Sequence, residues 1–315
     1  MYDCTTSRDL FVYLLCIIFH SSPIFFNCMY VSNDMHVRNE IYPYKRLLLP
    51  TYIKAPPDIE PDPRQVLANY HEYDQLVKLG YTTRKIMNEL VGHVFQNHDA
   101  GGDTRLHDVD EAVYRLCKMH RVYPGCLGYH GYPKSTCLNP DDIVAHGLPL
   151  WHMKLETIDI LGIDFVTFKN GLYVDVARTL VLKKGDVNNH LTRVTHDASI
   201  AAIAACKPGV SIGVVASIFG KYAKENGYTV AHGLHSHFIL NTIHGDVIPN
   251  TKILGSRNVL MEEGMVMAIE PIFNAGAGKI VGCQDDIAYR TADGSQSAHF
   301  EHTIVIEAGG AKIIA

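Results

Sequence analysis

The chain has 315 residues, 47% of them hydrophobic, which is enough to bury the core of one large domain or two modest ones. Its formal net charge is −5 at pH 7, so the basic surface typical of nucleic-acid binding is not expected. The eight cysteines form no Cys-x-x-Cys pair and lack the spacing of a zinc knuckle or a disulfide framework, which favours a reducing compartment.

Residues 1–55 differ from the rest, and we interpret them as a leader or targeting segment with a linker, expected to be disordered. Residues 10–19 form an apolar run of ten, too short to span a bilayer but sufficient for the core of a signal peptide. The alternative is an ordinary hydrophobic tail. The basic, Asn-containing stretch that follows resembles an organellar leader, for a plastid or a mitochondrion. The cytoplasm is the alternative location.

Four helices are predicted from the spacing of apolar residues, over residues 64–96, 106–117, 194–205 and 212–222. Pro208-Gly209 separates the third helix from the fourth, and Gly227 ends the fourth. Both signals are breaks that helices use at their carboxyl ends. The pattern therefore predicts one long helix followed by three shorter ones.

Strands are predicted in the remaining parts, over residues 126–182, 265–269 and 302–307, with a final hairpin at Gly309-Gly310. The helices are too polar on one side to be buried all round, so we expect them to cover the strands from outside. Together these elements predict a mixed α/β chain.

Two acidic residues lie on the two arms of one predicted hairpin. Asn170-Gly171 is a strong signal for a two-residue turn, and with this turn Asp164 faces Ala177 on the opposite strand. Asp175 is then a diagonal neighbour of Asp164 on the same face, about 7–8 Å away at the backbone. Because two carboxylates this close repel each other in a half-buried sheet, a cation is expected between them.

Three further residues are candidate ligands for that cation. His232 lies in an Ala-His-Gly sequence, Glu270 ends the predicted strand before Pro271, and Glu301 begins another strand. Carboxylates with one imidazole suit divalent ions such as Mn²⁺, Fe²⁺, Co²⁺ or Zn²⁺, and four carboxylates fit two ions that share bridging ligands. Taken one at a time, each residue has a plainer alternative, as a surface carboxylate or a loop histidine.

Four longer segments, with these five residues, resemble the type 1 methionine aminopeptidases, metallopeptidases of the pita-bread fold. The segments are Leu-Gly-Tyr-His-Gly-Tyr-Pro-Lys-Ser at 127–135, Asp-Ile-Val-Ala-His-Gly-Leu-Pro at 142–149, Ile-Glu-Pro-Ile-Phe-Asn-Ala-Gly at 269–276 and Phe-Glu-His-Thr at 300–303. The resemblance covers residues 52–315. It implies an α/β pita-bread catalytic domain over residues 56–315, with a curved antiparallel sheet, outer helices and a pseudo-twofold axis.

The resemblance implies roles for the acidic residues and the histidine. Asp164 would bind one of two divalent ions (Co, Mn, Fe or Zn), and Asp175 and Glu301 would bridge both. His232 and Glu270 would hold the other ion, and Glu270 would also shuttle a proton. A metal-activated water would then remove the N-terminal methionine of nascent proteins, which would make the chain a metalloaminopeptidase, a hydrolase.

Substrate contacts are implied by the same resemblance. His146 would hydrogen-bond the scissile amide, and sulfur and aromatic walls would suit the methionine side chain. The implied substrate-binding residues are Cys126, Tyr129, Tyr132, Cys137, His146, Phe238 and His237. Expected partners are nascent polypeptide N-termini, with the ribosome as a further candidate. We expect a monomer without nucleic acid and without stable membrane insertion of the catalytic domain.

Three departures from the family's pattern bear on the rate. A second substrate histidine of the family is expected at Ile239, Val176 stands where a hydroxyl follows the bridging aspartate, and Ile287 stands where bacterial members have a pocket tryptophan. His237 or His235 would have to replace the missing imidazole. The alternative function is therefore a catalytically weak or inactive protein that uses its cleft as a binding module. Proline-specific aminopeptidases share the ligands but lack the segment at 127–135.

Overall fold

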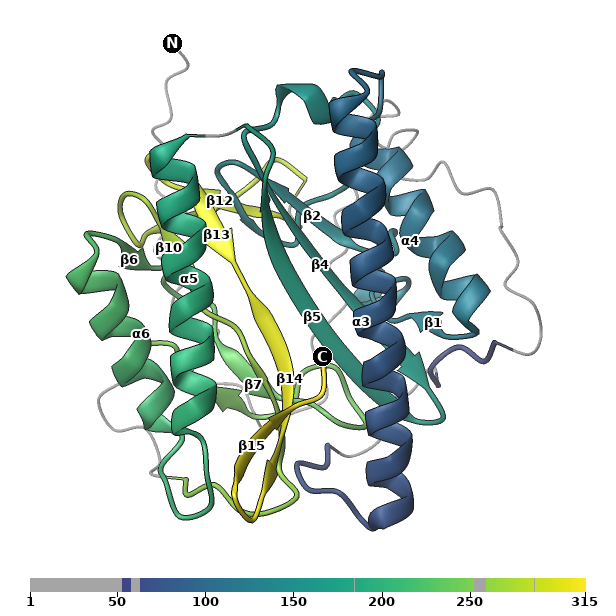
Figure 1. Cartoon of the computed structure of the whole chain (residues 1–315), viewed down its shortest axis with the longest axis vertical. Coiled ribbons are helices and arrows are strands. Elements are labelled where there is room, and N and C mark those ends of the chain that lie inside the picture. The colour runs from purple at the N-terminus through teal and green to yellow at the C-terminus, as the bar shows by residue number, and fades with distance from the viewer. Residues whose placement is uncertain (1–52, 58–62, 184, 252–258, 286) are drawn as a thin grey trace. The chain divides into compact units, whose positions relative to one another are not determined.

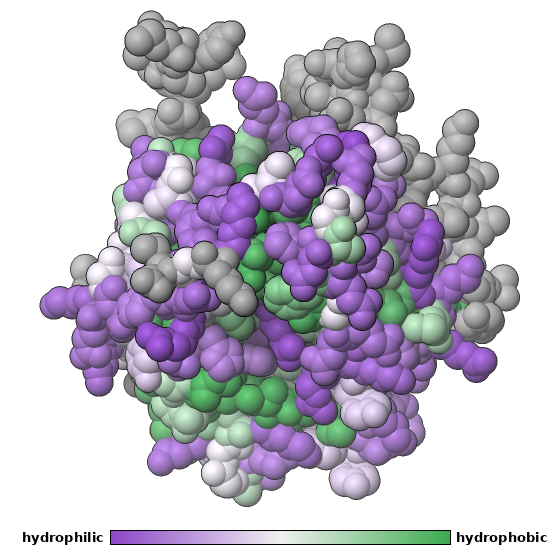
Figure 2. Space-filling model, turned by 45° about the horizontal axis from the view of Figure 1, so that its top comes forward, coloured by the Kyte–Doolittle hydropathy of each residue, from purple (hydrophilic) through white to green (hydrophobic). Residues whose placement is uncertain are grey.

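The computed structural model describes residues 53–57, 63–183, 185–251, 259–285 and 287–315 (Figure 1). The leader predicted over residues 1–55 lies almost wholly outside the described residues, and it stays a prediction. In the described part of the chain, no helix combines the length and the apolar character needed to cross a membrane. The surface in Figure 2 is mostly hydrophilic, with hydrophobic side chains gathered in patches between the polar ones.

The first two helices are α3 (Tyr70–Asp99) and α4 (Leu106–His120). Helix α3 begins six residues later than predicted because Asn69 caps it, accepting a hydrogen bond from the backbone N–H of Glu72. The preceding chain is extended, and Val66 forms a β-bridge with Met265. Helix α4 ends at Arg121, whose left-handed backbone (φ 58°) lets its N–H bond to carbonyls of the last turn.

A long hairpin, β4 (Ile160–Lys169) and β5 (Leu172–Val181), forms the middle of the sheet. Its turn residues Asn170 and Gly171 have φ of 55° and 84°, as a type I′ turn requires. Lys169 pairs with Leu172, and Asp164 pairs with Ala177. The predicted turn and register are therefore both confirmed.

The main sheet is antiparallel, in the order β1-β4-β5-β14-β9-β7-β8, with β15 beside β14 and β2 beside β4. Its other strands are β1 (Tyr123–Pro124), β2 (Cys137–Pro140), β7 (Ser236–Phe238), β8 (Val247–Ile248), β9 (Val266–Ile269), β14 (Glu301–Glu307) and β15 (Gly310–Ile313). The final hairpin joins β14 to β15 as predicted, with Glu307 opposite Gly310. Strands far apart in the sequence therefore lie side by side at the centre.

Two small sheets lie at one end of the main sheet. One has the order β13-β10-β6, from Ser297–His299, Ile272–Asn274 and Thr229–Val230. The other has the order β11-β12-β3, from Ile280–Gly282, Tyr289–Thr291 and Ile143–Ala145. Two 3₁₀ turns, Tyr129–Gly131 and Leu155–Thr157, complete the elements.

The second pair of helices is α5 (Asp186–Ala205) and α6 (Gly213–Glu225). Helix α5 begins eight residues before the predicted start at 194. The added turns include the buried Leu191, whereas polar residues on either side of it hide the apolar spacing in the sequence. Figure 1 shows α5 and α6 over the β14 side of the sheet, with α3 and α4 over the β5 side.

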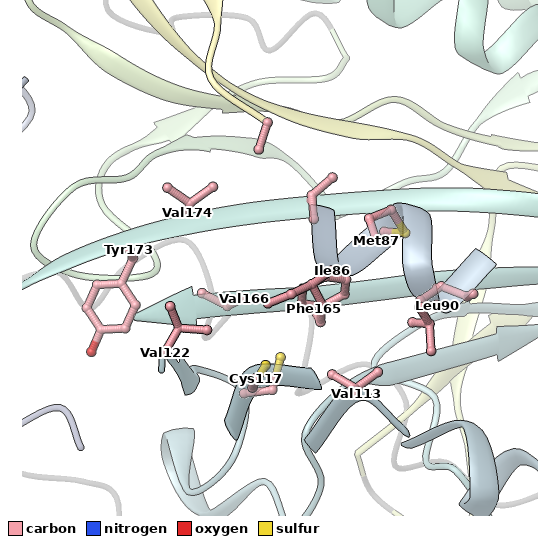
Figure 3. Packing of buried hydrophobic residues seen from close by; sticks show 14 of the residues in the cluster. Ile86, Met87, Leu90, Val113, Cys117, Val122, Phe165, Val166, Tyr173 and Val174 are labelled. Carbon is pink, nitrogen blue, oxygen red and sulfur yellow. The ribbon is translucent and has the colours of Figure 1, made fainter. Parts of the chain in front are cut away.

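Two hydrophobic clusters join the helices to the sheet. In the first, Ile86 and Leu90 of α3 pack with Phe165 of β4 and Val174 of β5 (Figure 3). In the second, residues of α5 and α6 pack on β9 and β14, including Val215, Phe219, Met267 and Ile304. Each half of the sheet thus has its own pair of outer helices, so the predicted layering, with helices outside a curved antiparallel sheet, is confirmed.

Substitutions at two glycines, one in the hairpin turn and one in helix α3, test the assigned turn. A Cβ added at Gly171 or at Gly92 would meet nothing within 4 Å, so only the backbone differs. Gly171 has φ of 84°, and Gly171→Ala should lower the free energy of unfolding by about 1–2 kcal/mol. Gly92 lies exposed within α3, where Gly92→Ala should raise it by about 0.5–1 kcal/mol. Urea unfolding of both variants checks the prediction, and equal shifts would contradict the assigned turn.

Candidate metal centre

The register of three strands brings four carboxylates onto one face of the sheet. Ala177 of β5 is the partner of both Asp164 on β4 and Glu301 on β14. Asp175 lies two residues before Ala177 and therefore projects from the same face. Ile269 pairs with His302, so the next residue, Glu270, comes opposite Glu301. The structure thus brings together all four acidic residues that the sequence singled out.

These carboxyl groups are poorly solvated. Asp175 and Glu301 are 4% and 2% exposed, and the side chain of Glu270 is 13% exposed. Burial, with the nearby Glu270, raises the pKa of Asp175 to about 7. Burial also raises the pKa of Asp164, Glu270 and Glu301 well above the usual range, and neighbouring carboxylates add to this for Asp164 and Glu301. At neutral pH the group can be fully ionised only with a compensating positive charge.

The histidine beside these carboxylates is His237. Its Nε2 lies 3.4 Å from Glu270 Oε1 and 3.8 Å from Glu301 Oε1. Ligand atoms of Asp175, His237 and Glu301 all lie within 4.8 Å of one another. Burial lowers the pKa of His237 to about 4, so the ring is neutral, the form of imidazole that binds metal ions.

His232, the histidine expected to join the cluster, lies outside it, and this expectation is corrected. Its side chain is exposed in the loop after β6, beside Gly278, whose carbonyl accepts its backbone N–H at 2.8 Å. The reason is the pairing of β7 with β9. His237 pairs with Ala268, two residues before Glu270, so both side chains share one face. The His-Gly pair at 232 resembles the family motif, but the strand pattern around residue 237 was the better signal for the ligand histidine.

A second histidine beside this group, His244, was not predicted from the sequence. Its Nδ1 lies 2.9 Å from the Tyr129 hydroxyl, and its ring centroid is 4.7 Å from that of His237. The side chain of His244 is exposed to solvent. Desolvation by neighbouring protein atoms, together with His237 and His146, lowers the pKa of His244 well below the usual value. Its place seven residues after His237 becomes meaningful only once His237 is recognised.

Ile239 is therefore not the position of a missing imidazole. The residue is fully buried in the first hydrophobic cluster, and its backbone N–H donates to the carbonyl of Val266. Val176 is 1% exposed and, next to Asp175 on β5, faces the core instead of the cluster. A hydroxyl does support Asp175: Thr303 Oγ1 accepts from its N–H at 2.9 Å and donates to its carbonyl at 2.8 Å. Ile287 lies in the β11–β12 loop, where its N–H is bound by Asp285.

The residues expected to contact the methionine side chain lie in two places. Cys137 pairs with Asp164 across β2 and β4, and its thiol hydrogen-bonds that of Cys126. Tyr129 and Tyr132 pack on the same hydrophobic cluster as Cys126. This part of the predicted pocket therefore adjoins the carboxylates.

Phe238 does not belong to this pocket, which corrects a further expectation. Because His237 faces the carboxylates, the next residue on β7 faces the opposite side, where Phe238 pairs with Met267 and packs under α5 and α6. The predicted pocket therefore has no wall at Phe238.

His146 follows β3 in a left-handed backbone conformation, with φ of 56°. The turn is tight, because a Cβ on Gly147 would lie 2.1 Å from the carbonyl oxygen of Leu138. The ring lies 5.9 Å from that of Tyr289 by centroids. Burial, with His299 nearby, lowers the pKa of His146. His146 is therefore a neutral imidazole close to His299.

Comparisons with known proteins agree with this site. The model of metallopeptidase family M24 matches residues 67–308. The methionine aminopeptidase of Escherichia coli K12 is 33% identical over 204 residues, which are 64% of this chain and 76% of that protein. Among solved structures, the methionine aminopeptidase of Thermotoga maritima has a TM-score of 0.74 at 30% identity, covering 80% of this chain and 99% of that chain.

More distant structures share the fold. The prolidase of Pyrococcus furiosus has a TM-score of 0.61 at 20% identity, covering 79% of this chain and 65% of that chain. The predicted pita-bread fold is confirmed by these neighbours together with the helices and the curled antiparallel sheet. With its carboxylate cluster and a family match over most of its length, the chain belongs to metallopeptidase family M24.

Proposed function

We propose that this chain removes the N-terminal methionine from nascent proteins by hydrolysis at a centre of two divalent metal ions. The observation that carries the proposal is the convergence of four carboxylates and one neutral imidazole on one face of the sheet. The methionine aminopeptidases among its relatives supply the reaction and the substrate.

The residues fit divalent ions, and the proposed ligands are Asp164, Asp175, His237, Glu270 and Glu301. In the described part of the chain, Glu301 Oε1 is a buried oxygen without a hydrogen-bond partner, as expected for an atom that awaits a cation. Oxygen donors with one imidazole suit Mn, Fe, Co or Zn. When bound, such ions lower the pKa of a coordinated water and polarise a carbonyl oxygen.

The side chains around the cluster have separate tasks in this proposal. Glu270, at the edge of the cluster, takes a proton from the attacking water and passes it to the leaving amine. His146 and His244 are neutral rings that lie close enough to interact electrostatically, and each can donate one N–H to the amide of the substrate. Glu270 and the two histidines therefore orient the peptide and move its proton.

The methionine side chain is proposed to lie against the thiols of Cys126 and Cys137, with Tyr129 and Tyr132 as further walls. The two thiols are buried near Asp164. Their mutual hydrogen bond and burial raise the pKa of Cys137, and burial raises that of Cys126 although the same hydrogen bond opposes it, so both remain neutral, soft surfaces. A polarizable, apolar wall suits a thioether.

The alternative of an inactive binding module loses its main support. That hypothesis rested on a missing imidazole at Ile239, whereas His244 lies beside Tyr129 and close to His237. We accordingly favour the enzyme. Nascent N-termini are its proposed partners, presented at the ribosome, and the protein is proposed to act as a monomer.

The first prediction separates two histidines by metal binding. His237→Ala should weaken the affinity for Mn²⁺ by more than the 10–100-fold typical of losing an outer-shell partner, whereas His232→Ala should leave it unchanged. At a free Mn²⁺ concentration 100 times the dissociation constant, the wild-type protein and His232→Ala should gain about 2.7 kcal/mol of stability. Isothermal titration and thermal unfolding measure both effects. Equal affinities of the two variants would remove His237 from the centre.

The second prediction concerns the reaction. The full chain, loaded with Mn²⁺ or Co²⁺, should release methionine from a Met-Gly peptide faster than it releases leucine from Leu-Gly or glycine from Gly-Pro. Amino-acid release is measured by chromatography. Glu301→Gln serves as the control, since it lacks one bridging carboxylate. A folded, metal-loaded wild-type protein that releases no methionine would contradict the proposed function.

The third prediction concerns location. We propose that residues 1–55 direct the chain to an organelle, a plastid or a mitochondrion, because a signal-like run precedes a basic stretch. A fusion of residues 1–60 to a fluorescent protein should then colocalise with an organelle marker in the source cells. Diffuse fluorescence in the cytoplasm would favour the alternative location.

A further inference from the structure

The proposed mechanism leaves one buried imidazole of the site unused. His299, on β13, is 4% exposed, and within the described residues neither of its ring nitrogens has a hydrogen-bond partner. Buried polar groups are normally satisfied, so an exception of this kind needs an explanation. Its place next to the carboxylate cluster points to a role in that site.

The backbone of His299 is fixed from both sides. Thr179 Oγ1 accepts the N–H of His299 at 2.8 Å and donates to its carbonyl oxygen at 2.9 Å. Thr179 is itself 4% exposed, on β5, and His299 also pairs with Ile272 on β10. The backbone of His299 is therefore held rigidly between the main sheet and a small sheet. This position sets the direction in which the ring points.

That direction leads to Glu270. His299 Nε2 lies 3.4 Å from Glu270 Oε2, and His237 Nε2 lies 3.4 Å from the other oxygen, Oε1. One carboxylate thus stands between two buried imidazoles, each of which faces a different oxygen. Two other titratable groups interact electrostatically with His299. Asp164 acts on the pKa of His299, and His299 acts on the pKa of His146.

We propose that His299 is a positioning residue, which donates Nε2–H to the outer oxygen of Glu270 and so turns the inner oxygen toward the metal centre. The separation of 3.4 Å needs to shorten by only a few tenths of an ångström to reach the usual N–H···O range. Metal-binding carboxylates are themselves commonly held by such hydrogen bonds. The inference rests on the proposed metal role of Glu270.

A second possibility is that His299 binds the metal directly. The ligand atoms within 4.8 Å of one another belong to Asp175, His237 and Glu301, and this group includes neither His299 nor Glu270. His299 Nε2 lies next to Glu270 Oε2, whereas His237 Nε2 lies next to Oε1. Direct ligation is the alternative that the paired substitutions of His299 exclude or favour.

Two substitutions of similar polarity test the proposal. In His299→Gln the amide nitrogen can take the place of Nε2, whereas in His299→Asn it takes the place of Nδ1 and cannot reach Glu270. Isothermal titration of the full chain with Mn²⁺ should show affinity about 10–100-fold weaker for His299→Asn and close to wild type for His299→Gln. In the peptide assay, His299→Asn should lower kcat with little change in KM, because the peptide itself is not contacted.

His302 provides a matched control. It is also a buried histidine near the cluster, yet its Nδ1 lies 3.0 Å from the carbonyl oxygen of Ala315, on the other face of β14. His302→Gln and His302→Asn should leave the Mn²⁺ affinity unchanged. A parallel loss in the His302 variants would mean that any buried imidazole matters there, which would overturn the proposal.

The outcomes are distinguishable. Wild-type affinity in His299→Asn, or an equal loss in His299→Gln and His299→Asn, would overturn the positioning role, and the second result would favour direct ligation. A wild-type protein that binds no metal would instead refute the proposed function. If His299→Asn does not fold, ¹⁵N NMR of the histidine rings in the Zn²⁺-loaded wild-type protein decides: the proposal requires a proton on Nε2 of His299, and its absence overturns it.

Discussion

The site depends on one constraint, the crowding of four carboxylates in a poorly solvated part of the sheet. Asp164 and Glu301 both pair with Ala177, on the strand between them. The small side chain of Ala177 leaves the space between the two carboxylates open. Asp175 is held in the same face by the paired hydrogen bonds of Thr303. Ladder hydrogen bonds prevent the strands from spreading to relieve the repulsion, so relief has to come from protons or from cations.

Strand alternation divides the residues between this face and the hydrophobic core. His237 faces the carboxylates while Phe238 packs under α5 and α6, and Asp175 faces them while Val176 packs in the core. The helices stay on the outer side for this reason, where they bury one face of the sheet and leave the other free. Core packing and site assembly are therefore two results of one register, and a slip by one residue would destroy both.

The predictability of each part follows from how local its cause is. The hairpin of Asp164 and Asp175 was predicted with the correct register because its turn, Asn170-Gly171, lies within the same short segment. The ligand histidine was placed wrongly because it depends on the pairing of β7 with β9, strands thirty residues apart in the chain. His244 was missed for the same reason, since it follows β7 and its place depends on the register of that strand.

Local departures from ordinary structure are found around this site. Glu301 carries a buried oxygen without a hydrogen-bond partner, His299 carries two such nitrogens, and His146 adopts a left-handed backbone. Departures of the same kind also occur elsewhere among the described residues, as in the buried hydroxyls of Thr192 and Ser199, which have no hydrogen-bond partner. A fold retains such costs where the surroundings enforce them, and they accumulate where a ligand completes the structure. The unsatisfied atoms of Glu301 and His299 therefore have a common explanation. Both belong to a metal-binding group of carboxylates and imidazoles whose interactions the protein alone does not complete.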